Sequence, residues 1–283
     1  AAINLIMPMD MIFGGVGFML GTGGSALVAK TLGEQDTDRA NRYFSMIIWV
    51  TVIVGAVLSV IGIAVIRPVS ILLGADEGML PDCVLYGSIM MGFTITFMFQ
   101  NAFQAFLITA ERPSLGLAAT IAAGISNMVL DALFIAVFDW GVAGAAVATG
   151  LSQCVGGVIP LIYFLRPNTS LLRLKRTKLE IRPIINACAN GASEMVSSVT
   201  SSVVGILYNL QLLQYAGENG VASYGVLMYV QFIFAAIFLG YSMGSAPVIS
   251  YHYGAEKHGE LKNLFQKSVV LMGTIGGGMV VAA

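Results

Sequence analysis

The sequence predicts an all-α integral membrane protein, folded as a polytopic bundle of helices. Of its 283 residues, 57% are apolar and only 10% are charged, whereas a soluble domain carries about 25% charged residues. The mean hydropathy is +0.84, and apolar stretches recur at about the 20-residue length that a helix needs to cross a membrane. This composition excludes a soluble enzyme and a disordered chain. The net charge of −1 argues against a nucleic-acid-binding protein.

Eight apolar stretches have the length of a membrane span or approach it. They are, in chain order, residues 3–29, 44–66, 84–108, 115–138, 141–165, 184–216, 221–250 and 266–283, the last of them incomplete. Continuous apolarity with many Gly and Ala residues favours helices, because the strands of a membrane barrel alternate apolar and polar side chains.

The segments between these stretches differ in charge. All of the 14 Lys and Arg residues except Arg67 lie in or beside one alternate set of segments. That set consists of residues 30–43, 109–114, 166–183 and 251–265, with Lys267 at its edge. The opposite set consists of residues 67–83, 139–140 and 217–220. Because basic loops stay in the cytoplasm, we expect the first set to be cytoplasmic and the protein to be a multi-pass protein of the cell (inner) membrane.

An internal repeat predicts how the helices are grouped. Gly24-Ser25-Ala26-Leu27-Val28 recurs as Gly244-Ser245-Ala246-Pro247-Val248, and Leu32-Gly33-Glu34 recurs around Gly254. An offset of about 220 residues contains six spans, so both copies have the same orientation, as in transporters built from parallel repeats.

This repeat predicts two six-helix lobes, of which the chain holds about helices 2 to 9 of 12. We expect residues 1–166 to be the remainder of the N-terminal lobe and residues 184–283 to be the start of the C-terminal lobe. Residues 167–183 are the expected basic cytoplasmic linker, and a solvated loop that sets the topology explains their charge. We expect the protein to be a monomer.

Asp131 is a candidate functional residue because a carboxylate inside a membrane span is costly. Asn127 lies one helical turn before it and shares its face. Thr149 lies at a similar depth on the next predicted helix, which only a short turn separates from the first. A carboxylate, an amide oxygen and a hydroxyl suit Na⁺, and the carboxylate alone can carry a proton. A hydrogen-bonded structural cluster is the alternative.

Glu194 is the second carboxylate well inside a span, whereas Asp10 and Asp82 lie nearer the outer ends of theirs. A stripe of serines surrounds Glu194, and close packing with hydrogen bonds to their own helix explains the serines but not the carboxylate. Glu194 is therefore a candidate for ion coupling or substrate binding.

Three further residues are candidates for lining a substrate cavity inside the membrane. They are Gln100, Gln104 and Tyr229. The amides could instead bond a neighbouring helix, and the aromatic ring could instead face lipid. The Cys and His residues match no disulfide, metal or catalytic spacing.

Four motifs together resemble the multidrug and toxic compound extrusion (MATE) family. They are Gly-Thr-Gly-Gly-Ser-Ala-Leu-Val-Ala-Lys-Thr-Leu-Gly (21–33), Asn-Met-Val-Leu-Asp (127–131), Gly-Val-Ala-Gly-Ala-Ala-Val-Ala-Thr (141–149) and Gly-Tyr-Ser-Met-Gly-Ser-Ala-Pro-Val-Ile (240–249). The resemblance is closest to the bacterial and archaeal branch that includes staphylococcal-type multidrug pumps. It implies twelve helices in two lobes that form a V.

The resemblance also implies a cation site in the N-terminal lobe. Archaeal relatives build it from an Asp on helix one, an Asn and an Asp four residues apart on helix five, and a Thr on helix six. Asn127, Asp131 and Thr149 match the last three, and helix one lies outside this chain. Some relatives have a functional Glu on helix seven, where Glu194 lies, although the alignment also permits Ser201.

We therefore expect a secondary active multidrug exporter that exchanges organic cations or drugs for Na⁺ or H⁺, with no cofactor and no enzymatic activity. A flippase for lipid-linked oligosaccharides, from the same superfamily, is the first alternative and would need a basic groove inside the membrane. A membrane-embedded enzyme that modifies lipids is the second, and it would need His, Asp or Arg residues clustered at one interface. Neither feature is visible in the sequence.

Overall fold

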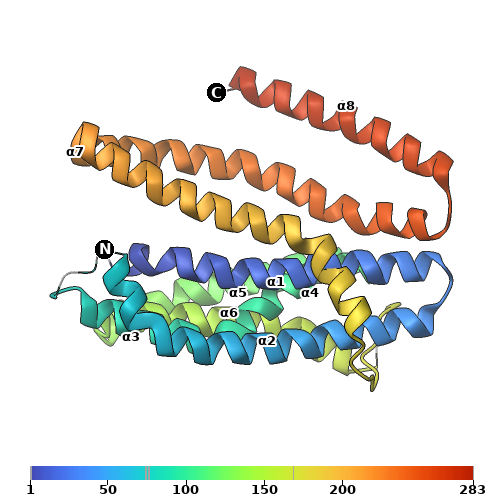
Figure 1. Ribbon diagram of the computed structural model, residues 1–283, viewed down its shortest axis with the longest axis horizontal. Helices are drawn as coiled ribbons and strands as arrows, with labels where there is room; N and C mark the ends of the chain where they lie inside the picture. Colours follow the sequence, from blue (N-terminus) through green and yellow to red (C-terminus); the bar gives the residue numbers. More distant parts are fainter. Residues whose placement is uncertain (1, 74, 76, 168, 283) are drawn as a thin grey trace.

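The computed structural model is all-helical in the part it describes, apart from turns and one linker (Figure 1). It describes residues 2–73, 75, 77–167 and 169–282. Within these ranges, nothing is described for the side chains of residues 2–5, 8, 206, 209, 210, 213, 216–223, 225, 226, 229, 230, 281 and 282. The elements are α1 (Ala2–Gly33), α2 (Thr37–Leu72), α3 (Leu80–Gly92), α4 (Thr94–Thr109), α5 (Pro113–Asp131), the π-helix η1 (Ala132–Val137), α6 (Gly141–Leu165), α7 (Ile181–Gly254) and α8 (His258–Ala282).

Most of the predicted spans are helices long and apolar enough to cross a membrane. Within the described residues these are Met9–Gly33, Thr37–Leu72, Pro113–Val137, Gly141–Leu165 and Gln231–Gly254. The helices α3 and α4 are bent by 53° relative to each other and make a sixth span if they are counted together. The prediction of an all-α polytopic bundle is confirmed.

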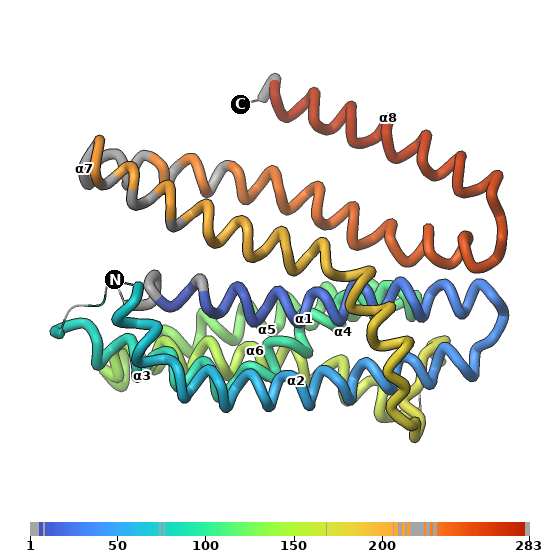
Figure 2. Tube along the Cα trace, in the orientation of Figure 1, coloured from blue at the N-terminus to red at the C-terminus, as the bar shows by residue number. Residues whose placement is uncertain are grey.

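The structure differs from the expected spans around α7. Residues 217–220, expected as a connection, are helical, so the stretches 184–216 and 221–250 belong to one element. We call residues 181–216 the first arm of α7 and residues 221–254 the second arm. Figures 1 and 2 show the two arms running in opposite directions on one side of the bundle of α1–α6, with α8 beyond them. The spans found within the described residues do not include 184–216 or 266–283, in which several side chains are not described.

The four basic loops lie together at one end of the molecule, as the charge pattern predicts. Arg112 donates from Nη2 to Thr169 Oγ1 at 2.7 Å. Lys175 Nζ forms an ion pair with Asp38 at 2.6 Å. Lys30 Nζ lies 5.4 Å from the centre of the Tyr253 ring. These contacts join all four loops.

Two of the turns at this end are alike in detail. In the turn from α1 to α2, Gln35 donates from its amide to the carbonyl of Leu32, and Asp36 to that of Thr31. In the turn from α7 to α8, Glu256 donates from its amide to the carbonyl of Tyr253, and Lys257 to that of His252. These two acceptors lie 221 positions after Leu32 and Thr31. Gln35 and Glu256 both have the left-handed backbone, with φ of 64° and 54°, that this helix termination requires. The repeat therefore extends to backbone geometry.

The linker from α6 to α7 is packed against α2. The amide of Arg173 donates to Asn41 Oδ1 at 2.6 Å, and the amide of Lys175 donates to Ser45 Oγ at 2.8 Å. Leu172, between them, is fully buried in the same core as Phe44. The linker is thus part of the packed structure, although its charge alone is explained by a solvated loop.

Glycine residues allow α1 to approach both arms of α7. On the first arm, an added Cβ on Gly23 would overlap the carbonyl oxygen of Ala187, and one on Gly191 would overlap that of Met19. Gly15 lies further along the same contact, where an added Cβ would come within 3.1 Å of Ser198 Cβ. Small residues are the usual means by which membrane helices pack backbone to backbone.

Candidate functional site

The helical hairpin of α5, η1 and α6 carries the three residues predicted to form a cation site. Asp131 is the last residue of α5, and the π-helical turn begins immediately after it. Asn127 lies one turn earlier, Thr149 lies on α6, and all three are half-buried. Such π-helical turns occur frequently at functional sites.

Aromatic packing at the outer turn holds this hairpin closed. The rings of Phe134 and Trp140 are stacked with their centroids 5.0 Å apart, and Trp140 donates from its amide to the carbonyl of Phe134 at 2.9 Å. An added Cβ on Gly144 would come within 3.1 Å of Phe134. The predicted antiparallel pairing of these helices is therefore present.

The three polar residues are not hydrogen-bonded to one another among the described residues. Asn127 Nδ2 is buried and has no hydrogen-bond partner there. Thr149 accepts at its backbone carbonyl from Ser152 Oγ at 2.7 Å. A buried amide without a partner carries a desolvation cost, and a ligand or water can relieve it.

Tyr86, which the resemblance did not assign to the site, lies near Asp131, and Asp10 lies near Tyr86. The phenol of Tyr86, on α3, is within electrostatic range of both Asp131 and Asp10. In the sequence of α1, Asp10 follows Ile6 and Met9 and precedes Phe13. These three apolar residues pack in the same cluster as Tyr86. The only sequence signal for Asp10 was its charge within a predicted span, and Tyr86 had none.

The bend between α3 and α4 lies against α6 next to Thr149. An added Cβ on Gly150 would overlap the ring of Phe93, which is the residue between the two helices. Cys154, one turn further along α6, lies 3.7 Å from Thr96 Oγ1. Four helices therefore border this region: α1, α3, the α5–η1 helix and α6.

Glu194 lies on the first arm of α7, away from this hairpin. It is half-buried, and its backbone carbonyl accepts from Ser198 Oγ at 2.9 Å. Ser202 donates in the same way to the carbonyl of Ser198 at 2.9 Å. These serines thus bond their own helix, as the structural alternative proposes, while the Glu194 carboxylate has no hydrogen bond or ion pair with any described residue.

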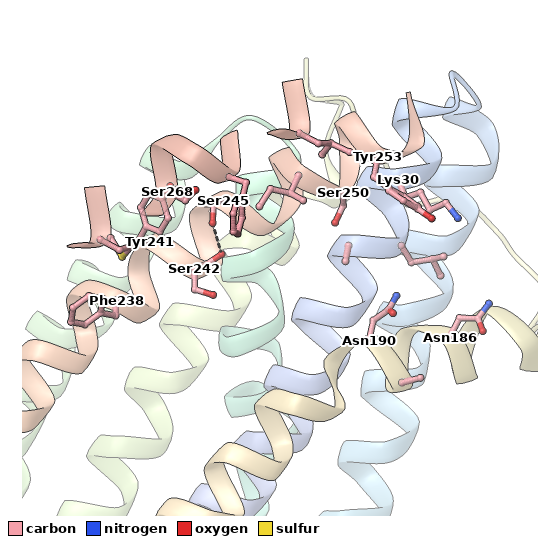
Figure 3. Close-up of a pocket in the computed structure, with 17 residues that line it drawn as sticks. Lys30, Asn186, Asn190, Phe238, Tyr241, Ser242, Ser245, Ser250, Tyr253 and Ser268 are labelled. Carbon is pink, nitrogen blue, oxygen red and sulfur yellow. Dashed lines mark hydrogen bonds between the residues drawn. The ribbon is translucent and has the colours of Figure 1, made fainter. Parts of the chain in front are cut away.

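A cavity of about 1010 Å³ lies between α1, both arms of α7 and α8 (Figure 3). Its lining is mixed, with hydroxyl, amide and aromatic side chains and one cation. The residues labelled in Figure 3 are Lys30, Asn186, Asn190, Phe238, Tyr241, Ser242, Ser245, Ser250, Tyr253 and Ser268. The Tyr241 hydroxyl and Ser268 Oγ are hydrogen-bonded at 2.6 Å, joining α7 to α8.

Gln100 and Gln104, two of the residues predicted to line a substrate cavity, do not line this one. Gln100 packs against Gly156 of α6, where an added Cβ would come within 2.8 Å of its side chain. Gln104 donates to Thr120 Oγ1 at 3.5 Å. The side chain of Tyr229 is outside the described residues. The two glutamines thus contact neighbouring helices, as the alternative for them proposes.

A comparison with protein-family models identifies the chain. The MatE model matches residues 1–133 and 194–283. The chain belongs to the MatE family. Its members are transporters and not enzymes, and the chain is accordingly a multi-pass membrane protein.

Individual MatE proteins are similar over nearly the whole chain. The multidrug export protein MepA of Staphylococcus saprophyticus is 28% identical over 278 residues, which cover 96% of this chain and 60% of MepA. The structure of a MATE P26A mutant superposes with a TM-score of 0.91 at 20% identity, covering 99% of this chain and 64% of that one. An outward-facing multidrug resistance MATE transporter of the MOP superfamily gives 0.90 at 20% identity, covering 99% and 63%. The chain therefore has the MATE fold and spans about three-fifths of the length of the curated relative.

Proposed function

We propose that the protein containing this chain is a secondary active multidrug exporter, which exchanges organic cations or drugs for Na⁺ or H⁺ by alternating access. The observation that carries the proposal is a half-buried carboxylate, Asp131, within a membrane-spanning helix of a MatE protein. An intramembrane carboxylate is costly to keep without a function. The name of MepA, multidrug export protein, supports the substrate class.

The coupling ion would bind in the outer half of the N-terminal bundle. Asp131 would supply the negative charge, and the Asn127 amide and Thr149 hydroxyl would supply further oxygen ligands. These are the hard donors that Na⁺ prefers, while a proton would need the carboxylate alone. A cation would bind the Asn127 amide oxygen, while the buried Nδ2, which has no partner among the described residues, could donate to a water or carboxylate beside it.

Asp10 and Tyr86 would complete this site from α1 and α3. Tyr86 lies near both carboxylates, and a second negative charge in the region favours a cation by Coulomb attraction. The Tyr86 hydroxyl can donate to whichever carboxylate is ionised. Tyr86 belongs to the buried cluster that also contains Ile6 and Met9, which lie close to Asp10 in α1.

Exchange would follow from linkage between ion and drug. If the ion and the drug favour opposite-facing states of the same protein, binding of one promotes release of the other. We place residues 1–166 in one lobe and residues 184–283 in the other, with 167–183 as linker, and infer that a monomer is the transporting unit. The cavity between α1, α7 and α8 and the carboxylate Glu194 are the candidate substrate contacts on the C-terminal side.

The proposal is tested by ethidium efflux from drug-sensitive cells that express the full-length protein. The Na⁺ gradient and the pH gradient are collapsed separately. Loss of efflux with one gradient identifies an antiporter and names its ion. Absence of efflux under every gradient, with membrane insertion verified, would contradict export of organic cations and would favour the flippase.

A further inference from the structure

A groove of about 410 Å³ on the outside of the α1–α6 bundle has the features of a lipid site. Its apolar part comes from three helices, with Trp49 and Val52 of α2, Phe99 of α4, and Leu161 and Leu165 of α6. The linker closes one end of it. The remaining lining residues are Ile48, Leu174, Lys175 and Arg176.

The groove lies at the cytoplasmic boundary of the membrane. Leu165 is the last residue of α6, and the basic linker follows it directly. Trp49 is 57% exposed and Leu165 is 64% exposed, so both present apolar surface outward. Tryptophan at this level is typical of the interface between headgroups and hydrocarbon.

The charges at its rim leave Arg176 available to an anion. Lys175 is already paired with Asp38 through Nζ at 2.6 Å. Arg176 is exposed and forms no ion pair with any residue in the described part of the chain. An arginine at this boundary can bind a phosphate with two parallel hydrogen bonds.

We propose that this groove binds an anionic phospholipid of the cytoplasmic leaflet. One acyl chain lies along Val52, Phe99 and Leu161, and the headgroup phosphate binds Arg176, with Lys175 nearby. Basic pockets between transmembrane helices on the cytoplasmic side are suited to anionic headgroups. The apolar groove and the cation at one end match both parts of such a lipid, whereas a soluble anion would use only the cation.

The lipid would bridge the linker and the bundle. Leu174, Lys175 and Arg176 belong to the linker, and the other lining residues belong to α2, α4 and α6. The linker is also held by its amides on Asn41 and Ser45. Bound lipid therefore adds a contact to a segment that is already docked. This inference does not depend on the transport activity proposed above.

Quenching of Trp49 fluorescence tests the site in the full-length protein. All other tryptophans are replaced by phenylalanine, and the protein is reconstituted in phosphatidylcholine with increasing brominated phosphatidylglycerol or brominated phosphatidylcholine. We expect phosphatidylglycerol to bind beside Trp49 about fivefold more tightly than phosphatidylcholine, and Arg176→Gln to remove most of that preference.

Arg182→Gln is the matched control, because Arg182 is a basic residue of the same region that does not line the groove. It should leave the preference unchanged. Equal quenching by the two lipids would overturn the proposal, as would a preference that survives Arg176→Gln. An equal loss in both variants would also overturn it, because the attraction would then come from the general basic charge of this face.

Discussion

Gly33 and Gly254 contact each other's helices in a reciprocal way. An added Cβ on Gly33 would overlap the carbonyl oxygen of Tyr251, and one on Gly254 would overlap that of Lys30. The offset of 221 residues relates Gly33 to Gly254 and Lys30 to Tyr251 alike. A two-fold axis produces reciprocal contacts of this kind. If one residue contacts a second, the residues equivalent to them contact each other as well. The pseudo-twofold axis of the repeat therefore passes between these two glycines.

This contact brings α1 and the second arm of α7 together at the cytoplasmic end. Lys30 also lies over the ring of Tyr253 there. In an alternating-access cycle, the same helices must separate when the protein opens to the cytoplasm. The reciprocal glycine contact is therefore a candidate for the seal of the outward-facing state.

We expect Gly254→Ala to loosen this seal. Overpacking costs about 1–3 kcal/mol, so the population open to the cytoplasm should rise roughly fivefold or more. The measurement is the labelling rate of Ser250→Cys, a cavity residue, by an impermeant thiol reagent added from the cytoplasmic side of a cysteine-free background. Gly259→Ala is the control, since an added Cβ there meets nothing within 4 Å among the described residues. Equal rates in the two variants would contradict the seal.

We expect Asp131→Asn to abolish coupled export while the protein still reaches the membrane. The substitution keeps the shape of the side chain and removes the charge that would bind Na⁺ or accept a proton. Ethidium efflux and surface abundance are measured together in the full-length protein. Asp139→Asn is the control, because Asp139 is exposed in the outer turn of the same hairpin. Unimpaired efflux by Asp131→Asn would remove Asp131 from the mechanism.

We expect Asp10→Asn to weaken ion coupling without removing it. Loss of the second carboxylate should shift the Na⁺ concentration for half-maximal efflux upward by about tenfold, or its pH dependence by about one unit if the ion is H⁺. The control is Asp82→Asn, whose side chain is exposed in the first turn of α3. An unchanged ion dependence in Asp10→Asn would mean that this carboxylate serves packing or solubility alone.

We expect Leu172→Ala to destabilise the docked linker. Leu172 is fully buried, and removal of a buried leucine side chain typically costs about 2–5 kcal/mol. Its neighbour Leu171 is 44% exposed, so Leu171→Ala should have little effect. The midpoint of thermal unfolding of the detergent-solubilised full-length protein distinguishes them. Similar midpoints for both variants would mean that the linker is not anchored at Leu172.

Much of the architecture was predictable from the sequence because the bilayer imposes simple rules on it. Hydrocarbon requires long apolar helices, and basic residues stay in the cytoplasm, so hydropathy and the segregation of all basic residues except Arg67 predicted the helical bundle and its common basic end. The repeat was visible because Gly33 and Gly254 lie in similar turns that need the same termination. Asn127 and Asp131 were paired by helical spacing alone, and Thr149 by a short turn.

Contacts between helices distant in the sequence were decided by the tertiary structure. Hydropathy does not record how a helix is rotated or which helix lies beside it, so only the fold revealed that Tyr86 lies near both Asp10 and Asp131. For the same reason Gln100 contacts Gly156 rather than the cavity, and the basic linker is docked on Asn41 and Ser45 of α2. The sequence by itself determined that the chain is a bundle of long apolar helices, most of its membrane spans, and which loops share the basic end. Close packing of glycine-lined helix faces determined which of their polar side chains meet.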